Sequence, residues 1–427
     1  MKRSISCFLT GATCLVSFLA IAQPTSPSST TGTNVNGANQ LNVINTAVPF
    51  LNFTPDARAG AMGDAGVASS PDANSIFWNP AKLVFSEKDA GVSLSYTPWL
   101  RDLIGDMYYT YLTGYKKLDK NSVIGGSLTY FDLGTIYFTT NQGVAAGQFN
   151  SREYAFTGSY SRRLSKNFSL GVNLKYLNSN LAGNTSVSGT ALKPGGTAAA
   201  DISAFYKKET RDDVSGKGIG LAFGGMISNL GGRISYGGEQ RYFIPTNLRL
   251  GTAVTYYADQ LSKFNFVLDV SKLMVPTPPN YGSPVSNPNG SVTRPILAGK
   301  DPNRNYFSAV FGSFGDAPGG FNEELQEINI ATGIEYWYND LFAARAGYYN
   351  EPNQKGGRKY FTAGIGLKLQ QRFGIDFSYL MPVKQGSPLA NTFRLSLVVD
   401  LLKGAKPLRD DADDEVPVDD TEPKDNE

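Results

Sequence analysis

Side chains that could do chemistry are scarce in this chain. The sequence contains no histidine, and its two cysteines, Cys7 and Cys14, both lie near the N-terminus. Without these residue types, a Ser-His or Cys-His nucleophile and the usual zinc ligand sets cannot be assembled. Carboxylates, lysines and tyrosines remain as candidate catalysts. We therefore expect a protein that is not an enzyme and that needs no cofactor and no metal.

The charged residues that remain sit in segments where apolar and polar residues alternate. Because every second residue of a strand points to the same face, these charges should share one face and the apolar residues the other. We expect them to line a polar interior and to hold an internal segment through charged hydrogen bonds, not to catalyse a reaction. The residues concerned are Lys175, Asp269, Arg345, Asp376, Arg394 and Asp400.

The alternation recurs in about fourteen segments after residue 90. In the last of them, Phe393, Leu395 and Leu397 share one face and Arg394 and Ser396 the other. A strand that crosses a bilayer needs roughly 9 to 11 residues and must lie in a closed sheet. The pattern predicts an all-β fold, a transmembrane antiparallel β-barrel of about 14 strands. The expected strands are 90–98, 107–118, 121–132, 151–163, 166–179, 197–208, 217–229, 244–258, 262–273, 326–338, 340–350, 358–370, 372–382 and 391–402.

A soluble β-sandwich also has alternating strands and is the alternative fold. The N-terminus favours the barrel, because it reads as a secretory signal. Lys2 and Arg3 precede an apolar stretch, and small residues end it at Ala22. We expect cleavage after Ala22, export to the cell outer membrane, and a mature chain without cysteine.

The rest of the chain divides by composition. Residues 23–42 are rich in Ser, Thr, Asn and Gly and read as a flexible leader. Residues 43–89 are rich in small residues and do not alternate, which suits a plug inside the barrel. Residues 90–402 form the barrel, and the ten acidic residues after Arg409 indicate that 403–427 is a disordered, acidic periplasmic tail.

Loop lengths suggest an orientation. With the N-terminus in the periplasm, alternate connections should be short periplasmic turns and long external loops. Most connections fit, but 207–217 is long for a periplasmic turn. The longest connection, 274–325, holds eight of the 23 prolines, a composition that cannot continue a strand ladder.

Two groups of residues are candidate sites. In the plug, Asp56 should cap a turn and Arg58 should pair with a carboxylate of the wall; a sharper hypothesis is that this pair controls passage. Asn79 and Pro80 should form a turn that ties the plug to the wall, again with gating as the minority interpretation.

In the long loop, aromatic side chains stand among glycines. Such side chains either fold over the barrel mouth or meet a partner. The candidates are Tyr306, Phe307, Phe311 and Phe314. A β-rich partner could also add strands to ordered loop edges. Basic residues are scattered and no phosphate-binding fingerprint opens a helix, so no nucleic acid is indicated.

Several segments resemble one family. The stretch from Phe50 to Ala68, followed by Phe77-Trp-Asn-Pro-Ala, resembles the N-terminal signature of the PorV family of the type IX secretion system. The C-terminal third is similar too, in the segments that begin at Glu335, Arg345, Lys355, Asp376 and Pro388.

The resemblance implies a plugged, fourteen-stranded barrel of the fatty-acid-transporter type that does no chemistry. Its partners would be outer-membrane lipid, the giant translocon barrel, secreted cargo proteins with C-terminal β-domain signals, and the cell-surface sortase complex that attaches cargo. The rival function is a channel for fatty acids or similar hydrophobic molecules, which would need an apolar tunnel to a lateral gap in the wall. A sister barrel of the same secretion system is a third possibility.

Overall fold

The computed structural model describes residues 41–139, 145–183, 186–187, 190–191, 193–237, 239–288 and 291–401. The expected signal peptide, almost all of the leader, and the acidic tail lie outside these residues.

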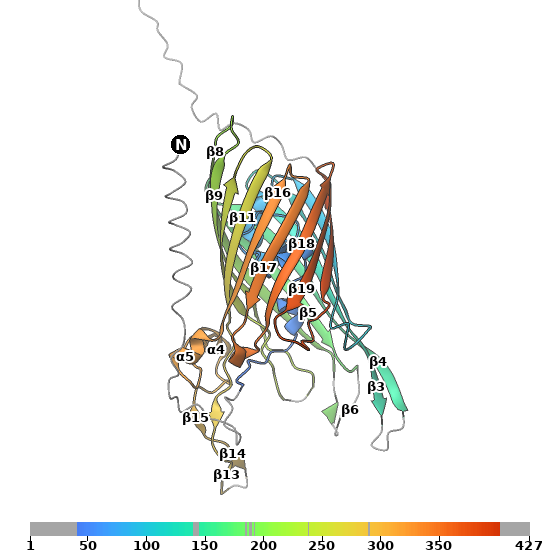
Figure 1. Ribbon diagram of the computed structural model, residues 1–427. Coiled ribbons are helices and arrows are strands. Elements are labelled where there is room, and N and C mark those ends of the chain that lie inside the picture. The colour runs from blue at the N-terminus through green and yellow to red at the C-terminus, as the bar shows by residue number, and fades with distance from the viewer. Residues whose placement is uncertain are drawn as a thin grey trace, which may run out of the picture. The chain divides into compact units, whose positions relative to one another are not determined.

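Fourteen strands close into one antiparallel barrel (Figure 1). Each strand pairs with its neighbours in the chain, and the first strand pairs with the last, with Leu94 opposite Leu397. The predicted all-β barrel is therefore confirmed, together with its strand number. The wall strands are β1 (Ala90–Pro98), β2 (Tyr108–Lys117), β3 (Ser122–Thr139), β4 (Ala145–Arg163), β5 (Phe168–Asn180), β8 (Gly195–Arg211), β9 (Gly218–Gly231), β10 (Asn247–Tyr257), β11 (Ser262–Leu273), β16 (Ile328–Tyr338), β17 (Phe342–Asn350), β18 (Lys359–Leu369), β19 (Phe373–Pro382) and β20 (Phe393–Asp400).

The wall is apolar outside and polar inside. In β19 and β20, Ile375 is 43% exposed and Leu397 44% exposed, whereas Ser378 and Ser396 are fully buried. Water would not favour this arrangement, but a bilayer does, because lipid contacts the apolar face and the lumen takes the polar one. The alternating pattern in the sequence thus corresponds to a membrane barrel and not to a soluble sandwich. Among the described residues, no helix is long and apolar enough to cross a bilayer.

The two ends of the barrel differ. Short turns join the strands at one end, which we call the turn end; they include 118–121, 164–167, 258–261 and 370–372. The opposite end, the loop end, carries the long connections, of which 274–327 is the longest. In Figure 1 the loop end is at the bottom.

Three strand ends extend well beyond the sequence-based expectation. β3 continues to Thr139 and β4 begins at Ala145, where a long loop was expected. Gly134 has φ +80, and the pairing register shifts between Asp132 and Thr135, so the ladder continues past a β-bulge. At the turn end β8 runs on to Arg211, which shortens the expected 207–217 turn to 212–217.

The long loop contains secondary structure that composition did not predict. Its short strands pair in two hairpin-like ladders, β12 (Asn280–Tyr281) with β15 (Ile296–Ala298) and β13 (Val285–Ser286) with β14 (Val292–Thr293). Two helices follow, α4 (Tyr306–Gly312) and α5 (Phe321–Leu325). Asn305 caps α4 by accepting a hydrogen bond from the Phe307 N–H. In the connection 181–194, β6 (Ser186–Val187) pairs with β7 (Thr190–Ala191). One further turn of 3-10 helix, η3 (Asn353–Lys355), lies between β17 and β18.

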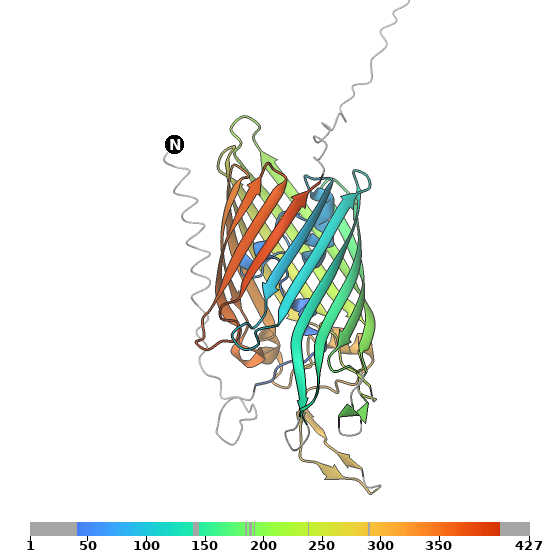
Figure 2. The ribbon, with the colours of Figure 1, turned by 90° about the vertical axis from the view of Figure 1, so that its right-hand side faces the viewer.

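Residues 43–89 fill the lumen as a plug (Figure 2, blue). Its helical turns are η1 (Pro49–Asn52), α2 (Ala57–Ala61), α3 (Ser75–Trp78) and η2 (Pro80–Phe85). The described chain starts at the loop end, where the Asn42 N–H donates to the Gln354 carbonyl at 3.2 Å. The plug segment ends at the turn end of the barrel, where Ala90 begins β1. The expectation of a periplasmic N-terminus did not anticipate this path, because the strand pattern starts only at residue 90.

Missing side chains in the wall allow the plug to pack closely. Gly333 of β16 pairs with Gly347 of β17; Met62 of the plug lies against both glycines, and Gly63 lies against Gly347. A β-carbon at Gly333 would lie 2.5 Å from that of Met62, and one at Gly347 would overlap the Gly63 nitrogen. Gly63 itself has φ +70, a conformation that favours glycine. The small residues noted in the sequence therefore serve contact between plug and wall.

Candidate functional site

Asp56 organises the plug. Its Oδ2 accepts the Ala59 N–H at 2.8 Å and so caps α2, and its Oδ1 accepts the Trp78 Nε1–H at 2.7 Å. The carboxylate is buried and joins two plug segments that are 22 residues apart. The cap follows from local sequence, whereas the bond to Trp78 depends on tertiary packing and had no signal in the sequence.

Arg58 connects the plug to the wall. Its Nε and Nη2 donate to the two carboxylate oxygens of Glu335 in β16, each at 2.8 Å. Nη1 also pairs with Asp72 of the plug at 3.0 Å. Glu335 in turn accepts from Arg345 at 2.7 Å, and Arg345 pairs with Asp376 at 2.6 Å. The result is a buried network of alternating charges, in which each cation meets two carboxylates.

Asn79 and Pro80 hold the plug at a second place. The Asn79 side-chain amide donates to the carbonyl of Ala204 in β8 at 3.0 Å, and its Oδ1 accepts the Ala81 N–H. The Pro80 carbonyl accepts from Ser161 of β4 at 2.7 Å. The amide and the carbonyl therefore tie the plug to two different strands.

A third anchor between plug and wall involves Asp269, which the sequence analysis named, and Lys82, which it did not. Asp269 faces the lumen, as its position in the alternation suggested, and its Oδ2 accepts both the Gly66 and the Val67 N–H at 2.7 and 2.8 Å. Lys82, buried in the plug, donates to the Gly66 carbonyl at 2.6 Å and to Ser69. Nothing in the sequence singled out Lys82.

The remaining charged residues predicted to face the lumen also have partners. Lys175 pairs with Asp201 at 2.8 Å, and Asp400 with Lys368 at 2.9 Å. Arg394 donates to the Thr54 carbonyl of the plug at 3.2 Å. These contacts fit a structural use of the charges in the lumen.

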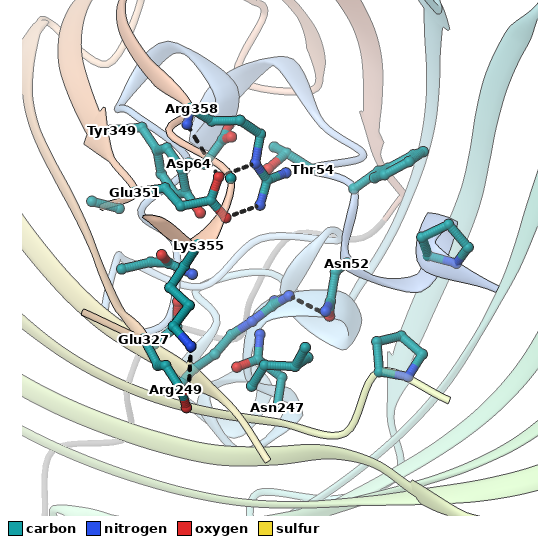
Figure 3. Close-up of a pocket in the computed structure, with 18 of the residues that line it drawn as sticks. Asn52, Thr54, Asp64, Asn247, Arg249, Glu327, Tyr349, Glu351, Lys355 and Arg358 are labelled. Carbon is teal, nitrogen blue, oxygen red and sulfur yellow. Dashed lines mark hydrogen bonds and ion pairs between the residues drawn. The ribbon is translucent and has the colours of Figure 1, made fainter. Parts of the chain in front are cut away.

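Among the residues that the structure describes, two cavities large enough for a small molecule lie between plug and wall. One, of about 330 Å³, lies on the loop-end side between plug residues 43–54 and the wall (Figure 3). The other, of about 250 Å³, lies near the turn end. The first is lined by many charged side chains, including Arg249, Lys355 and Arg358. This lining differs from the apolar tunnel that a channel for hydrophobic molecules would need.

At the loop end, α4 and α5 form a surface that we call the loop platform, residues 306–325. Tyr306 points inward: its hydroxyl accepts the Gly231 N–H at 2.9 Å, and its ring stacks on Phe243. The other three candidates are exposed, Phe307 by 64%, Phe311 by 56% and Phe314 by 48%. Phe321 of α5, which the sequence analysis did not single out, is 75% exposed.

Ion pairs fix this platform to the barrel. Lys272 at the end of β11 pairs with Glu324 at 3.0 Å and with Glu327. Lys355 pairs with Glu323 at 2.5 Å and with Glu327 at 2.9 Å. Within the long loop, Arg304 pairs with Asp316 at 2.6 Å.

The platform carboxylates respond differently to their surroundings. Burial alone would raise the pKa of Glu323, but the hydrogen bonds from Lys355 and the Gly319 N–H outweigh it and hold the pKa below its usual range. Burial raises the pKa of Asp316, despite the Thr277 N–H and Arg304. Within the residues that the structure describes, no group of three or more carboxylates is arranged to hold a metal ion.

The comparison with protein families decides where this barrel belongs. The model of the type IX secretion system protein PorV matches residues 36–280, which is more than half of the chain. The chain belongs to the PorV family. As a PorV-family barrel it is a component of type IX secretion and lies in the outer membrane. The resemblance noted in the plug is thereby confirmed as a family relationship, whereas the C-terminal segments lie outside the matched residues.

Solved structures similar to this PorV-family chain are barrels as well. The toluene transporter TbuX of Ralstonia pickettii is 11% identical, with a TM-score of 0.42, over 82% of this chain and 97% of its own. The toluene transporter TodX of Pseudomonas putida is 12% identical, with a TM-score of 0.44, over 82% of this chain and 99% of its own. A FadL homologue of Pseudomonas aeruginosa is 12% identical, with a TM-score of 0.41, over 82% and 98%. No curated protein matches the sequence.

Proposed function

We propose that this barrel binds the C-terminal β-domain of secreted cargo at its loop end. It would receive cargo at the large translocon barrel of the type IX system and pass it to the attachment complex on the cell surface. Membership of the PorV family supports the pathway. The loop platform supports the place of binding.

The observation that carries the proposal is a fixed surface with exposed aromatic side chains. Phe307, Phe311 and Phe321 are each more than half exposed, yet the helices that carry them are fixed. Phe321 stands on α5, which the ion pairs of Lys272 and Lys355 anchor, and Phe307 and Phe311 stand on α4, which Tyr306 anchors through its contacts with Gly231 and Phe243. Aromatic side chains held in place at low entropic cost are typical anchors of protein interfaces. A platform of this kind can bind several cargo proteins that share one domain type.

The loop end should face the outside of the cell. In barrels of the bacterial outer membrane, short turns face the periplasm and long loops the exterior. This orientation puts the platform where cargo emerges and where the surface attachment complex works. It also puts the entry of the plug chain on the outside.

The plug serves this function as a scaffold. Arg58, Asn79 and Pro80 join it to wall strands, and Asp56 joins two segments within the plug, so that the plug braces the wall under the loops. We propose no catalytic step, and passage of a hydrophobic solute is the weaker alternative because charged side chains line the cavity behind the loops.

Affinity purification of the tagged barrel from gently solubilised outer membranes tests the proposal. The co-purifying proteins, identified by mass spectrometry, should include a very large barrel and proteins that share a C-terminal β-domain. Recovery should fall at least tenfold in the double variant Phe307→Ser/Phe311→Ser. The matched control is Tyr137→Ser, because Tyr137 is 73% exposed on the β3–β4 hairpin, away from α4 in Figure 1. A barrel that co-purifies only with bound fatty acid would overturn the proposal.

A further inference from the structure

The cavity on the loop-end side contains an arginine whose charge is not neutralised. Arg249 of β10 is only 7% exposed, and its guanidinium lies beyond ion-pair distance of every carboxylate among the described residues. Among the same residues its one polar contact is a long hydrogen bond from Nη2 to the Asn52 side-chain oxygen at 3.3 Å, which Figure 3 shows. The rings of Phe77 and Trp78 lie 5.0 and 5.3 Å from its guanidinium carbon.

The neighbouring cations in the same cavity are already paired. Arg358 donates to both oxygens of Glu351, at 2.9 and 2.8 Å, and Lys355 pairs with Glu327 at 2.9 Å. A buried charge is costly unless an opposite charge or several hydrogen bonds compensate for it. Two aromatic faces and one amide oxygen compensate Arg249 only in part. The guanidinium has five N–H donors, and the described residues use one of them.

Acceptor oxygens without donors lie beside this arginine. Asn247 precedes Arg249 by two residues, so both side chains lie on the luminal face of β10. Its Oδ1 is buried and accepts no hydrogen bond from the described residues. The same is true of Oδ1 of Asp269, which lies on the adjacent strand β11 opposite Gly251. Both residues line the cavity.

An unpaired guanidinium beside unpaired acceptor oxygens fits a ligand that has both a negative group and a hydrogen-bond donor. A carboxylate fits a guanidinium through two parallel charge-assisted hydrogen bonds. If the ligand also carries a donor near its carboxylate, such as an ammonium group, that donor could hydrogen-bond to the carboxylate of Asp269 and to the unpaired side-chain oxygen of Asn247. The volume of about 330 Å³ is at the lower end of ligand pockets and suits a small molecule.

We propose that the loop-end cavity binds a small amino carboxylate, with its carboxylate on Arg249 and its ammonium group toward Asp269 and Asn247. The site is separate from the loop platform, since Arg249 and Asp269 are wall residues and the platform aromatics are exposed at the surface. Binding would complete the charge balance between η1 and strands β10 and β11.

Titration of the full-length barrel in detergent with single amino acids tests this inference. Glycine, alanine, serine and leucine are the probes, followed by isothermal calorimetry and by ligand-observed NMR. Acetate and methylammonium, each carrying one half of the recognised group, are the comparison ligands, and chloride is the adventitious anion. At least one amino acid should bind saturably and ten or more times more tightly than acetate, methylammonium or chloride.

Variants tie the binding to the site. Arg249→Gln should weaken binding at least tenfold, Arg249→Lys should keep part of it, and Asn247→Ala should weaken it less. The control is Arg372→Gln, a turn-end arginine that should leave affinity unchanged. Heat-modifiable migration on gels verifies that each barrel is folded. The inference is wrong if no probe binds folded wild type, if acetate or chloride binds as well as the amino acids, or if Arg249→Gln binds them equally.

Discussion

Arg58 in the plug and Glu335 in the wall are joined by two parallel hydrogen bonds of 2.8 Å, although 277 residues separate them in the chain. Both side chains are buried, and Glu335 is shared with Arg345. The pair therefore couples the position of the plug to strands β16 and β17.

Removing the cation of this pair should loosen the plug. In Arg58→Met, the carboxylates of Glu335 and Asp72 lose a partner, and breaking a buried pair costs about 3–5 kcal/mol. We expect the plug to leave its position part of the time and single-channel conductance in planar bilayers to rise above that of the wild type. Arg372→Met, at an exposed turn, should conduct like the wild type. Equal conductance of all three proteins would show that the pair does not retain the plug.

The contact between glycines predicts a steric effect. In Gly347→Ala, the new methyl group meets the plug backbone at Gly63, which cannot move away without breaking the hydrogen bond from its N–H to Thr362 at 2.9 Å. Such overpacking costs about 1–3 kcal/mol. The midpoint of urea unfolding from detergent should fall accordingly. Gly158→Ala is the matched control, because nothing lies within 4 Å of its added β-carbon; a similar midpoint for both variants would contradict the close packing.

The anchoring of the loop platform should weaken as the pH falls. The pKa of Glu323 is lowered, so its ion pair contributes stability above the usual carboxyl pKa, and that contribution is lost as the pH falls through the lowered value. Asp316 has a raised pKa and acts in the opposite sense, since its protonation relieves the cost of a buried charge. We expect the platform to stay ordered at pH 5 and to loosen below about pH 4.

A spin label at Asn322→Cys measures this transition. Asn322 is exposed on α5, and the only cysteines in the sequence, Cys7 and Cys14, precede the expected cleavage site. The electron paramagnetic resonance spectrum should sharpen below about pH 4 in the wild-type background. In Glu323→Gln it should already be sharp at neutral pH. A spectrum that sharpens as the pH rises would contradict the assigned direction of the pKa shift.

The path of the plug chain predicts surface exposure near the start of the described residues. Asn45 is exposed, and Ala47, two residues later, donates its N–H to the Phe243 carbonyl in a loop-end connection. With the loops outside, Asn45→Cys should react with a membrane-impermeant maleimide on intact cells. Lys120→Cys, in the turn between β2 and β3, should react only after the outer membrane is permeabilised. The reverse result would place the loop end in the periplasm.

Alternation in the sequence predicted most of the wall because each strand contacts lipid on one side along its whole length. β1 and β11 have the predicted boundaries, Ala90–Pro98 and Ser262–Leu273. The prediction failed where strands leave the bilayer: β3 and β4 continue as a hairpin, and there neither face needs to be apolar.

The sequence predicted the role of single residues in the site, but not which residues they would contact. A wall carboxylate was expected for Arg58, but its identification as Glu335 required the register of β16 in the closed barrel. Tyr306 and Phe307 are neighbours of the same type, yet one is an internal anchor and the other is 64% exposed. The difference arises from the rotation of α4, which composition rich in proline and glycine did not reveal.

The central claim is that cargo and secretion partners meet the loop platform. The most direct measurement is in vivo photo-crosslinking with a photoreactive phenylalanine analogue at Phe307, compared with the same analogue at Leu174, which is 70% exposed on the wall. The account predicts adducts at Phe307 with proteins that carry a common C-terminal β-domain or with the translocon, and none of these at Leu174. Absence of such adducts at Phe307 in secreting cells, with the barrel folded and present, would contradict it.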